Sequence, residues 1–341
     1  MSKSFNKSFK RSARPSLSLD DYVSGISQGN IAVLSQAITL VESSIRSDSK
    51  LADDIIENCL PKSGKSIRIG ITGVPGVGKS TFIETFGGYL TSKEHKVAVL
   101  AIDPSSQNSG GSILGDKTRM ESLVQNTNVF IRPSPSKGSL GGVAQATRET
   151  IVLCEAAGFD VVLIETVGVG QSEIAVRSMV DFFLLLMLAG AGDELQGIKR
   201  GIMEMADAVV ITKADEDNLN NAKRAMLEYK NALHLFPASK SQWIPKVEHC
   251  SALQNYNLDK VWGIIDSYKN LTINNGFYDE NRSKQAKFWL DEKIVELLRL
   301  DFESTNQIQE TMEKLNAQVI KGEKSPFKAA DEIMKIYRGR K

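Results

Sequence analysis

The stretch Gly73-Val74-Pro75-Gly76-Val77-Gly78-Lys79-Ser80 decides the fold of this chain. It matches G-x-x-x-x-G-K-[ST], the pattern of a loop whose backbone N–H groups surround a polyphosphate. An apolar run at 67–71 precedes it and a helical pattern at 81–90 follows it, so the loop joins a strand to a helix. The N-terminus of that helix adds partial positive charge at the phosphates. The residues that we expect to contact a nucleotide here are Gly73, Val74, Pro75, Gly76, Val77, Gly78, Lys79, Ser80 and Thr81.

Two side chains of this loop have distinct expected roles. Lys79 should reach the β- and γ-phosphates, and the hydroxyl of Ser80 should bind Mg²⁺. A glycine-rich turn without a ligand is the alternative, but it would not require all four fixed residues together with the strand and the helix.

The bulk composition is that of a soluble globular protein, with 41% hydrophobic and 24% charged residues among 341. The net charge is +1, so we expect neither nucleic acid nor a membrane as a partner. The longest apolar stretch, 182–192, is too short to span a bilayer. Cys59, Cys154 and Cys250 lie far apart, which indicates a reducing compartment. We therefore expect a cytoplasmic protein, and the basic, Ser-rich first 15 residues leave the mitochondrial matrix as the alternative.

The order of the patterns divides the chain into four segments. We expect a disordered basic tail at 1–18, a helical extension at 19–60, the nucleotide-binding domain at 61–272 and a helical arm at 273–341. Apolar residues at three- and four-residue spacings indicate the helices. For the C-terminal helices, a layer packed on the core and an arm that forms a dimer fit the pattern equally well.

Strand and helix patterns alternate through the middle of the chain, which predicts an α/β fold with a mostly parallel sheet flanked by helices. The expected strands lie at 66–72, 97–102, 129–132, 161–166, 182–189, 208–212 and near 247–251. Ligands in such sheets bind beyond the carboxyl ends of the strands. The candidate functional residues follow those ends.

Three acidic residues are candidates for the metal site that a phosphate loop requires. Asp103 ends the second expected strand, and Asp116 follows a Gly/Ser-rich stretch that can close over a ligand. Glu165 ends the fourth strand, where many GTP-binding proteins have Asp-x-x-Gly. A hard dication such as Mg²⁺ takes oxygen ligands, often one or two carboxylates with water. The segment from Gly168 to Gln171 would sense the γ-phosphate and move when it leaves.

The sixth strand ends in Thr212-Lys213-Ala214-Asp215, which resembles the Asn-Lys-x-Asp base-reading motif. Asp215 would accept hydrogen bonds from N1–H and N2–H₂ of guanine, and Lys213 would lie along the base plane. Adenine lacks this donor pair and would leave a buried carboxylate unpaired. Ser251-Ala252-Leu253 follows the next strand and matches the short loop that contacts the guanine oxygen. The order of these motifs fits a GTPase better than a small-molecule kinase.

Longer segments between these motifs resemble the MeaB/ArgK family, the G-protein chaperones of adenosylcobalamin-dependent methylmalonyl-CoA mutase. The similar segments are Asp103-Pro104-Ser105-Ser106 and the residues 110–120, 165–173 and 189–204. The similarity covers about residues 30–270.

The resemblance implies a homodimeric GTPase of the SIMIBI branch of P-loop proteins, with Mg²⁺ as cofactor, GTP or GDP as ligand and the mutase as partner. It assigns nucleotide and metal roles to Lys79, Ser80, Asp103, Asp116, Glu165, Lys213 and Asp215. It also implies that Asp193, Gln196 and Lys199 belong to a mobile loop that couples nucleotide state to the mutase. Thr212 stands where the base-reading motif usually has asparagine, which puts the strictness of guanine selection in question.

The expected reaction is in-line hydrolysis of GTP, with Lys79, Asp103 and Glu165 as the catalytic residues. Asp103 either orients the attacking water or only holds the metal shell. No arginine finger is evident, so a partner would speed a slow reaction. By the resemblance, nucleotide state then gates adenosylcobalamin loading and the protection or reactivation of the mutase. The alternatives are a metal-insertion GTPase of the same branch, a small-amine (arginine-type) kinase and a nucleotide-binding scaffold without turnover.

Overall fold

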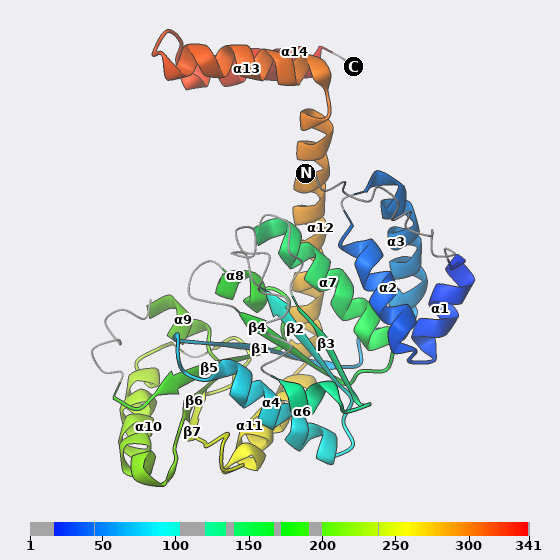
Figure 1. The fold of residues 1–341 in the computed structure, drawn as a ribbon. Coiled ribbons are helices and arrows are strands. Elements are labelled where there is room, and N and C mark those ends of the chain that lie inside the picture. Colours follow the sequence, from blue (N-terminus) through cyan, green and yellow to red (C-terminus); the bar gives the residue numbers. More distant parts are fainter. Residues whose placement is uncertain are drawn as a thin grey trace, which may run out of the picture. The chain divides into compact units, whose positions relative to one another are not determined.

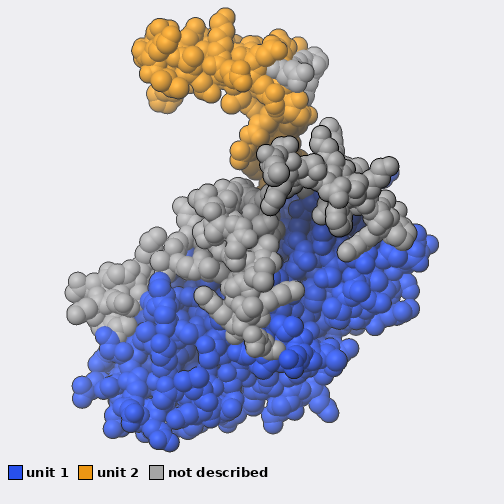
Figure 2. Space-filling view, in the orientation of Figure 1, with its two compact units in different colours: residues 1–279 blue, residues 280–341 orange. Residues whose placement is uncertain are grey.

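The computed structural model describes residues 17–43, 45–102, 120–133, 140–166, 172–190, 200–237 and 239–339. The chain divides into two compact units, residues 1–279 and 280–341 (Figure 2). None of the helices in the described ranges has both the length and the apolar character needed to cross a membrane.

Unit 1, residues 1–279, is built on a sheet in which seven strands are described, in the order β3-β2-β4-β1-β5-β6-β7 (Figure 1). All neighbouring pairs are parallel, which confirms the predicted α/β fold. The strands lie within one or two residues of their predicted ends. They are β1 (Ile67–Gly73), β2 (Val97–Ile102), β3 (Val129–Arg132), β4 (Val161–Thr166), β5 (Phe182–Leu188), β6 (Ala208–Thr212) and β7 (Lys246–His249).

The central strand β1 is enclosed on all sides. It lies between β4 and β5 in the sheet, and all of its residues are buried. Helices cover both faces, which explains why the strands read as nearly continuous apolar runs. Ile69, Ile71 and Leu184 belong to the large core that this arrangement creates. The predicted phosphate loop therefore starts from the central strand of the sheet, which is buried along its whole length.

Two crossover helices lie on opposite faces of the sheet (Figure 1). Helix α4 (Lys79–Ser92) joins β1 to β2, and α7 (Leu140–Ala156) joins β3 to β4. The two connections run in opposite directions across the sheet, so right-handed crossovers place their helices on different faces. Helix α11 (Leu258–Asn274) contacts α4, and α8 (Ser172–Arg177) contacts α7. The other described helical elements between β1 and β7 are α6 (Glu121–Val124), α9 (Arg200–Met205), the 3₁₀ turn η3 (Glu216–Asn218) and α10 (Leu219–Leu233).

Three helices precede the sheet, as the apolar periodicity predicts. They are α1 (Leu19–Ser27), α2 (Ile31–Val41) and α3 (Arg46–Cys59), and the 3₁₀ turn η1 (Leu60–Lys62) follows them. The three helices contact one another and pack on α7. Ser18 closes a capping box with Asp21 at the start of α1. The side chains that this layer buries completely include Ile26, Leu34, Ile38 and Ile55.

Unit 2, residues 280–341, consists in its described part of helices joined by short turns. Helix α12 (Phe277–Glu303) begins at the end of unit 1 and is followed by α13 (Asn306–Ile320) and α14 (Pro326–Arg338). Helices α13 and α14 pack on each other. Along α12, exposed apolar side chains include Leu290, Val295, Leu297, Leu298 and Leu300. An apolar surface of this extent on one helix indicates a surface for interaction.

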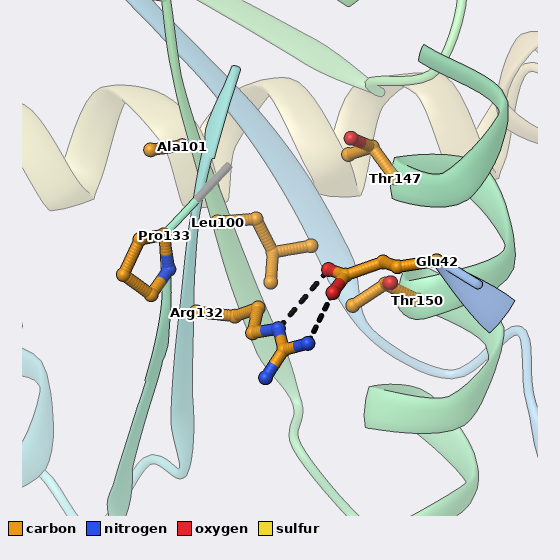
Figure 3. Close-up of a pocket in the computed structure, with 7 residues that line it drawn as sticks. All are labelled: Glu42, Leu100, Ala101, Arg132, Pro133, Thr147 and Thr150. Carbon is orange, nitrogen blue, oxygen red and sulfur yellow. Dashed lines mark hydrogen bonds and ion pairs between the residues drawn. The ribbon is translucent and has the colours of Figure 1, made fainter. Parts of the chain in front are cut away.

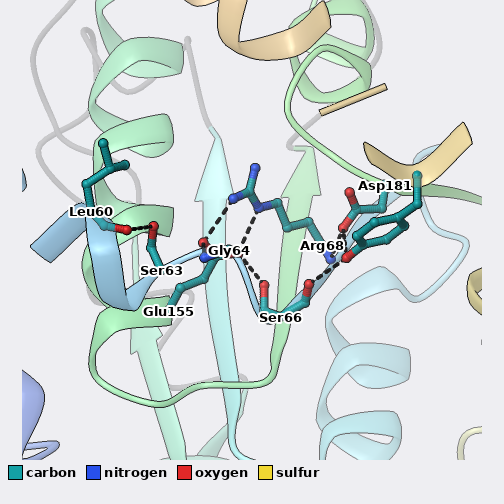
Figure 4. A network of polar contacts seen from close by, with 8 residues as sticks. Leu60, Ser63, Gly64, Ser66, Arg68, Glu155 and Asp181 are labelled. Atoms are coloured by element: carbon teal, nitrogen blue, oxygen red, sulfur yellow. Dashed lines mark hydrogen bonds and ion pairs between the residues drawn. The ribbon is translucent and has the colours of Figure 1, made fainter. Parts of the chain in front are cut away.

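A buried polar network fixes the N-terminal end of β1 (Figure 4). Arg68 donates two parallel hydrogen bonds to Glu155 of α7, from Nε to Oε1 and from Nη2 to Oε2, each at 2.9 Å. Glu155 also accepts from Ser66 Oγ at 2.6 Å and from the backbone N–H of Gly64 at 2.7 Å. Both charged side chains are buried, so each depends on the other for its charge to be tolerated in the core.

Tyr278, in the first turn of α12, joins the same network. Its Oη donates to the carbonyl oxygen of Ser66 at 2.9 Å and lies 3.3 Å from Oδ2 of Asp181. Asp181 also accepts from the backbone N–H of Arg68 at 2.8 Å. The start of α12 is thereby fixed to the N-terminal ends of β1 and β5.

Arg68→Ala should lower the free energy of unfolding by about 3 kcal/mol, because it leaves the Glu155 carboxylate buried without its counter-charge. Urea denaturation at pH 7 measures the loss. Arg224→Ala removes an exposed arginine from α10 and should change the same quantity by less than about 0.5 kcal/mol. Equal losses in the two variants would contradict the role given to the buried pair.

Candidate functional site

The phosphate loop owes its shape to three glycines. Gly76 and Gly78 have φ values of 77° and 86°, in the left-handed region that glycine adopts without strain. Gly73 has a different constraint, since a Cβ there would lie 2.5 Å from the carbonyl oxygen of Leu186 on β5. Gly78 forms the cap from which α4 begins, so the loop turns directly into the helix N-terminus. Backbone N–H groups and the helix dipole then point at one anion site.

Lys79 closes this loop onto its own backbone. Its Nζ donates to the carbonyl oxygen of Gly73 at 2.9 Å. Burial lowers the pKa of Lys79, and the negative charges of Glu165 and Glu173 oppose that shift. The ammonium group is thus held, partly desolvated, at the place where the sequence predicts the β- and γ-phosphates. A phosphate oxygen arriving there would gain more from this charge than it would in water.

The ends of β1 and β4 bring a second set of polar groups to the loop. Glu165 pairs in register with Ile71 of β1 and is 7% exposed. The Thr166 hydroxyl donates to the Thr72 hydroxyl at 2.8 Å, which joins the two strand ends beneath the loop. Ser80, in the first turn of α4, is half-buried. A hydroxyl and a carboxylate are both oxygen donors, which is the chemistry that Mg²⁺ prefers.

The predicted base-reading residues lie beside the phosphate loop. Thr212, at the end of β6, donates from Oγ1 to the carbonyl oxygen of Val77 at 2.8 Å. Lys213 has a φ of 55°, a strained value for a side-chain-bearing residue. A Cβ placed on Gly78 would lie 3.9 Å from Lys213 Cε, so the lysine stem runs along the loop. Strain of this kind at a strand end indicates a functional constraint on where the side chain points.

Asp215 and the loop after β7 are joined directly. Ser251 Oγ donates a short hydrogen bond to Asp215 Oδ1. The backbone N–H of Ala214 also donates to the carbonyl oxygen of Cys250 at 3.0 Å. The T-K-x-D and S-A-L segments, 36 residues apart at Asp215 and Ser251, therefore form one surface. Leu253 is 76% exposed, which leaves it accessible to a base.

Part of the predicted site lies outside the described residues. This applies to the metal candidates Asp103 and Asp116 and to Gly168, Gln171, Asp193, Gln196 and Lys199. Their roles stay predictions. Among the described residues, no group of three or more His, Cys, Asp or Glu side chains is gathered as a metal site. The described part of the predicted Mg²⁺ shell is therefore Ser80 with Glu165.

Two features of this site are not predicted by the sequence patterns. Glu173 stands in the sequence only as the end of a segment similar to the family, yet its side chain is buried near Lys79. The Thr166–Thr72 hydrogen bond is not predicted either, because two threonines on different strands carry no signal of being neighbours. The apolar residues Val176 and Val180, three and seven positions after Glu173, are the signal that could place Glu173 on the inner face of its helix.

A small pocket at the ends of β2 and β3 contains an ion pair that connects two parts of the fold (Figure 3). Arg132 Nε donates to Glu42 Oε1 at 3.0 Å, and the second guanidinium nitrogen pairs with Oε2. Glu42, the C-cap residue of α2, therefore neutralises the charge of Arg132. The pair links the N-terminal helices to the edge of the sheet. The other lining residues are Leu100, Ala101, Pro133, Thr147 and Thr150.

Comparison with known proteins agrees with this geometry. The family model described as methylmalonyl Co-A mutase-associated GTPase MeaB matches residues 34–307. GTPase ArgK of Escherichia coli is 47% identical over 278 residues, covering 82% of this chain and 84% of its own. The mouse methylmalonic aciduria type A homolog, mitochondrial, is 44% identical over 332 residues, covering 94% and 80%. A solved structure of a LAO/AO transport system kinase has a TM-score of 0.73 and 36% identity, covering 94% of this chain and 97% of that chain.

A central parallel strand that feeds a phosphate loop, together with relatives named as GTPases, defines the protein as a P-loop GTPase. With more than half of its residues matched by one family model, the chain belongs to the MeaB family of mutase-associated GTPases.

Thr212→Val should weaken GTP and GDP binding in parallel, by about fivefold to thirtyfold, because it leaves the buried carbonyl of Val77 without its donor. Isothermal titration with each nucleotide measures the effect. Thr212→Ser retains the hydroxyl and should stay within about threefold of the natural protein. If valine binds nucleotide as well as serine does, the hydroxyl does not support the loop.

Proposed function

We propose that this GTPase is a chaperone of an adenosylcobalamin-dependent methylmalonyl-CoA mutase. Its nucleotide state would gate the loading of adenosylcobalamin and the protection or reactivation of the mutase. The observation that supports this most is the match of residues 34–307 to a family described as mutase-associated. The described site supports the nucleotide-binding part of this proposal, because its polar groups converge on the phosphate loop and the predicted base-reading residues.

In this proposal Lys79 binds the β- and γ-phosphates and neutralises charge as the γ-phosphoryl group transfers to water. To reach them its ammonium gives up its hydrogen bond to Gly73. Ser80, Asp103, Asp116 and Glu165 would hold Mg²⁺, whose charge stabilises the transferring phosphoryl group when it is bound. Buried surroundings at Glu165 exclude water from one side of the site.

The segments that would carry the signal to the mutase are those predicted to follow the γ-phosphate. They comprise Gly168 and Gln171 after β4, and Asp193, Gln196 and Lys199 after β5. Loops that γ-phosphate contacts order and hydrolysis releases are a recurrent way of switching a partner. Because β4 and β5 are the two neighbours of β1, both loops would begin beside the phosphate site.

We also propose that the protein is a homodimer held by its C-terminal helices. The exposed apolar side chains of α12, which include Leu297, Leu298 and Leu300, favour contact with a second copy over solvent. The cytoplasm remains the proposed compartment. All three cysteines are free, and burial raises the pKa of the Cys154 and Cys250 thiols, which keeps them protonated and unreactive.

The central experiment measures the complex with purified methylmalonyl-CoA mutase in the presence of GDP or a non-hydrolysable GTP analogue. The affinity should differ by about tenfold between the two nucleotides, a usual size for coupling between sites. The mutase should also raise the rate of inorganic phosphate release from GTP. Lys79→Ala should abolish both the hydrolysis and the difference in affinity.

Two outcomes of this experiment would contradict the proposal. One is GTP hydrolysis by a chain that forms no complex with the mutase under either nucleotide. The other is transfer of the γ-phosphate to arginine added to the assay, since the solved relative is named a kinase. The second outcome would favour the small-amine kinase.

Asp215→Asn should lower the affinity for GTP by roughly 10- to 100-fold, because a charged acceptor for two guanine N–H groups is lost. Affinity for xanthosine triphosphate should rise, since the asparagine amide can donate to the xanthine O2. Asp217→Asn removes an exposed acid two residues away and serves as the control. Unchanged selectivity in the Asp215 variant, measured by competition between the two nucleotides, would reject the base-reading role.

A further inference from the structure

Glu173 is a buried acid for which the functional assignments above have no role. It lies in the first turn of α8, and only 1% of its surface is exposed. An acid in a first helical turn is usually stabilised by the helix dipole while its carboxylate stays in water. That role needs no burial. A buried carboxylate is tolerated where a counter-charge or hydrogen bonds compensate its burial, and the ammonium of Lys79 is one such charge.

The packing of α8 shows which way Glu173 faces. Val176, one turn further along, is fully buried, and its Cγ1 lies 2.7 Å from where a Cβ on Gly70 would be. The glycine thus lets α8 approach β1 closely. Residues three apart share one face of a helix, so Glu173 faces the sheet too.

The direction of α8 then places Glu173 at the phosphate loop. Val176 lies over Gly70, in the middle of β1. The helix follows the carboxyl end of β4, at the edge of the sheet that carries the phosphate loop, and its last turn reaches Asp207, directly before β6 at the opposite edge. The helix therefore runs antiparallel to the strand, with its first turn at the loop. At its other end, Arg177 Nη1 donates to Asp207 Oδ2 at 2.8 Å. Asp207 also accepts from the backbone N–H of Phe183, which fixes this end to β5.

We propose that Glu173 is a positioning residue for Lys79 that responds to the γ-phosphate. Before nucleotide binds, its carboxylate, together with Glu165, balances the lysine ammonium over the phosphate loop. When GTP binds, the γ-phosphate takes over this role and repels Glu173, because the two are negative charges that share one cation. The first turn of α8 then moves away while its last turn stays tied to Asp207. GDP brings only its β-phosphate to Lys79, so it repels Glu173 less and leaves it nearer the lysine.

This inference rests on the phosphate loop binding GTP and GDP, and it does not depend on the mutase. In this inference the charge of Glu173 lowers the affinity for GTP relative to the affinity for GDP. This repulsion would make the position of α8 depend on the bound nucleotide. No residue of α8 needs to contact the base.

The test is the ratio of the dissociation constants for GDP and a non-hydrolysable GTP analogue, measured by calorimetry on the full chain with Mg²⁺. Glu173→Gln should tighten binding of the GTP analogue by about tenfold and that of GDP by less than about threefold, because like charges several ångströms apart in a partly buried site repel by about this much. Glu173→Asp keeps the charge and should keep the natural ratio. Glu204→Gln removes an exposed charge from α9 and should keep it as well.

A ratio in Glu173→Gln that rises by less than about threefold overturns the proposal, whether both affinities are unchanged or both fall together. A parallel fall would show that Glu173 only supports the loop. Binding of both nucleotides by the natural protein in the same experiment shows that the site itself works. Should the glutamine variant not fold, hydrogen exchange of residues 172–177 in the natural protein decides. Exchange should be faster with the GTP analogue than with GDP, and equal rates reject the mechanism.

Discussion

The close approach of Gly73 to the carbonyl of Leu186 permits only glycine at the point where β1 ends and the phosphate loop begins. No side chain fits between these two strands at that point, since a Cβ would come within 2.5 Å of the oxygen. The chain must therefore leave the sheet as glycine, and two left-handed glycines then turn it into α4. Everything that binds phosphate depends on this exit, because it sets the direction of the loop N–H groups and of the helix dipole.

The second constraint is electrostatic. An ammonium group held against a backbone carbonyl inside a partly buried loop is a site prepared for an anion. Two buried acids next to it, Glu165 and Glu173, keep that charge tolerable. Lys79 therefore has partners within the protein, and a nucleotide must replace these interactions when it binds. A nucleotide that replaces them differently in two conformations can shift a segment of the protein from one to the other.

The sheet could be predicted from the sequence because each strand and the loop after it show their pattern within a short stretch of residues. Strands buried on both faces must be apolar along their whole length, and loops at their ends must hold the polar residues. The phosphate loop and the strand order along the chain follow from patterns of this kind. The position of Thr212 could also be predicted, but its hydrogen bond to Val77, 135 residues away, could not. That bond and the Arg68–Glu155 pair, which spans 87 residues, arise only through tertiary packing, so no short pattern records them. The same holds for the burial of Glu173 beside Lys79.

Polar contacts hold the central strand β1 at both of its ends. At its C-terminal end β1 carries the phosphate loop, which Thr212 holds from the base-reading side. At its N-terminal end Arg68 holds α7, and Tyr278 holds the start of α12 through Ser66. Helix α8 lies along the same strand, with its first turn at the phosphate loop and its last turn tied to Asp207. In the proposed mechanism, a change at the phosphates shifts the first turn of α8 relative to β1. A partner that contacts this turn would then respond to the nucleotide without contacting the nucleotide itself.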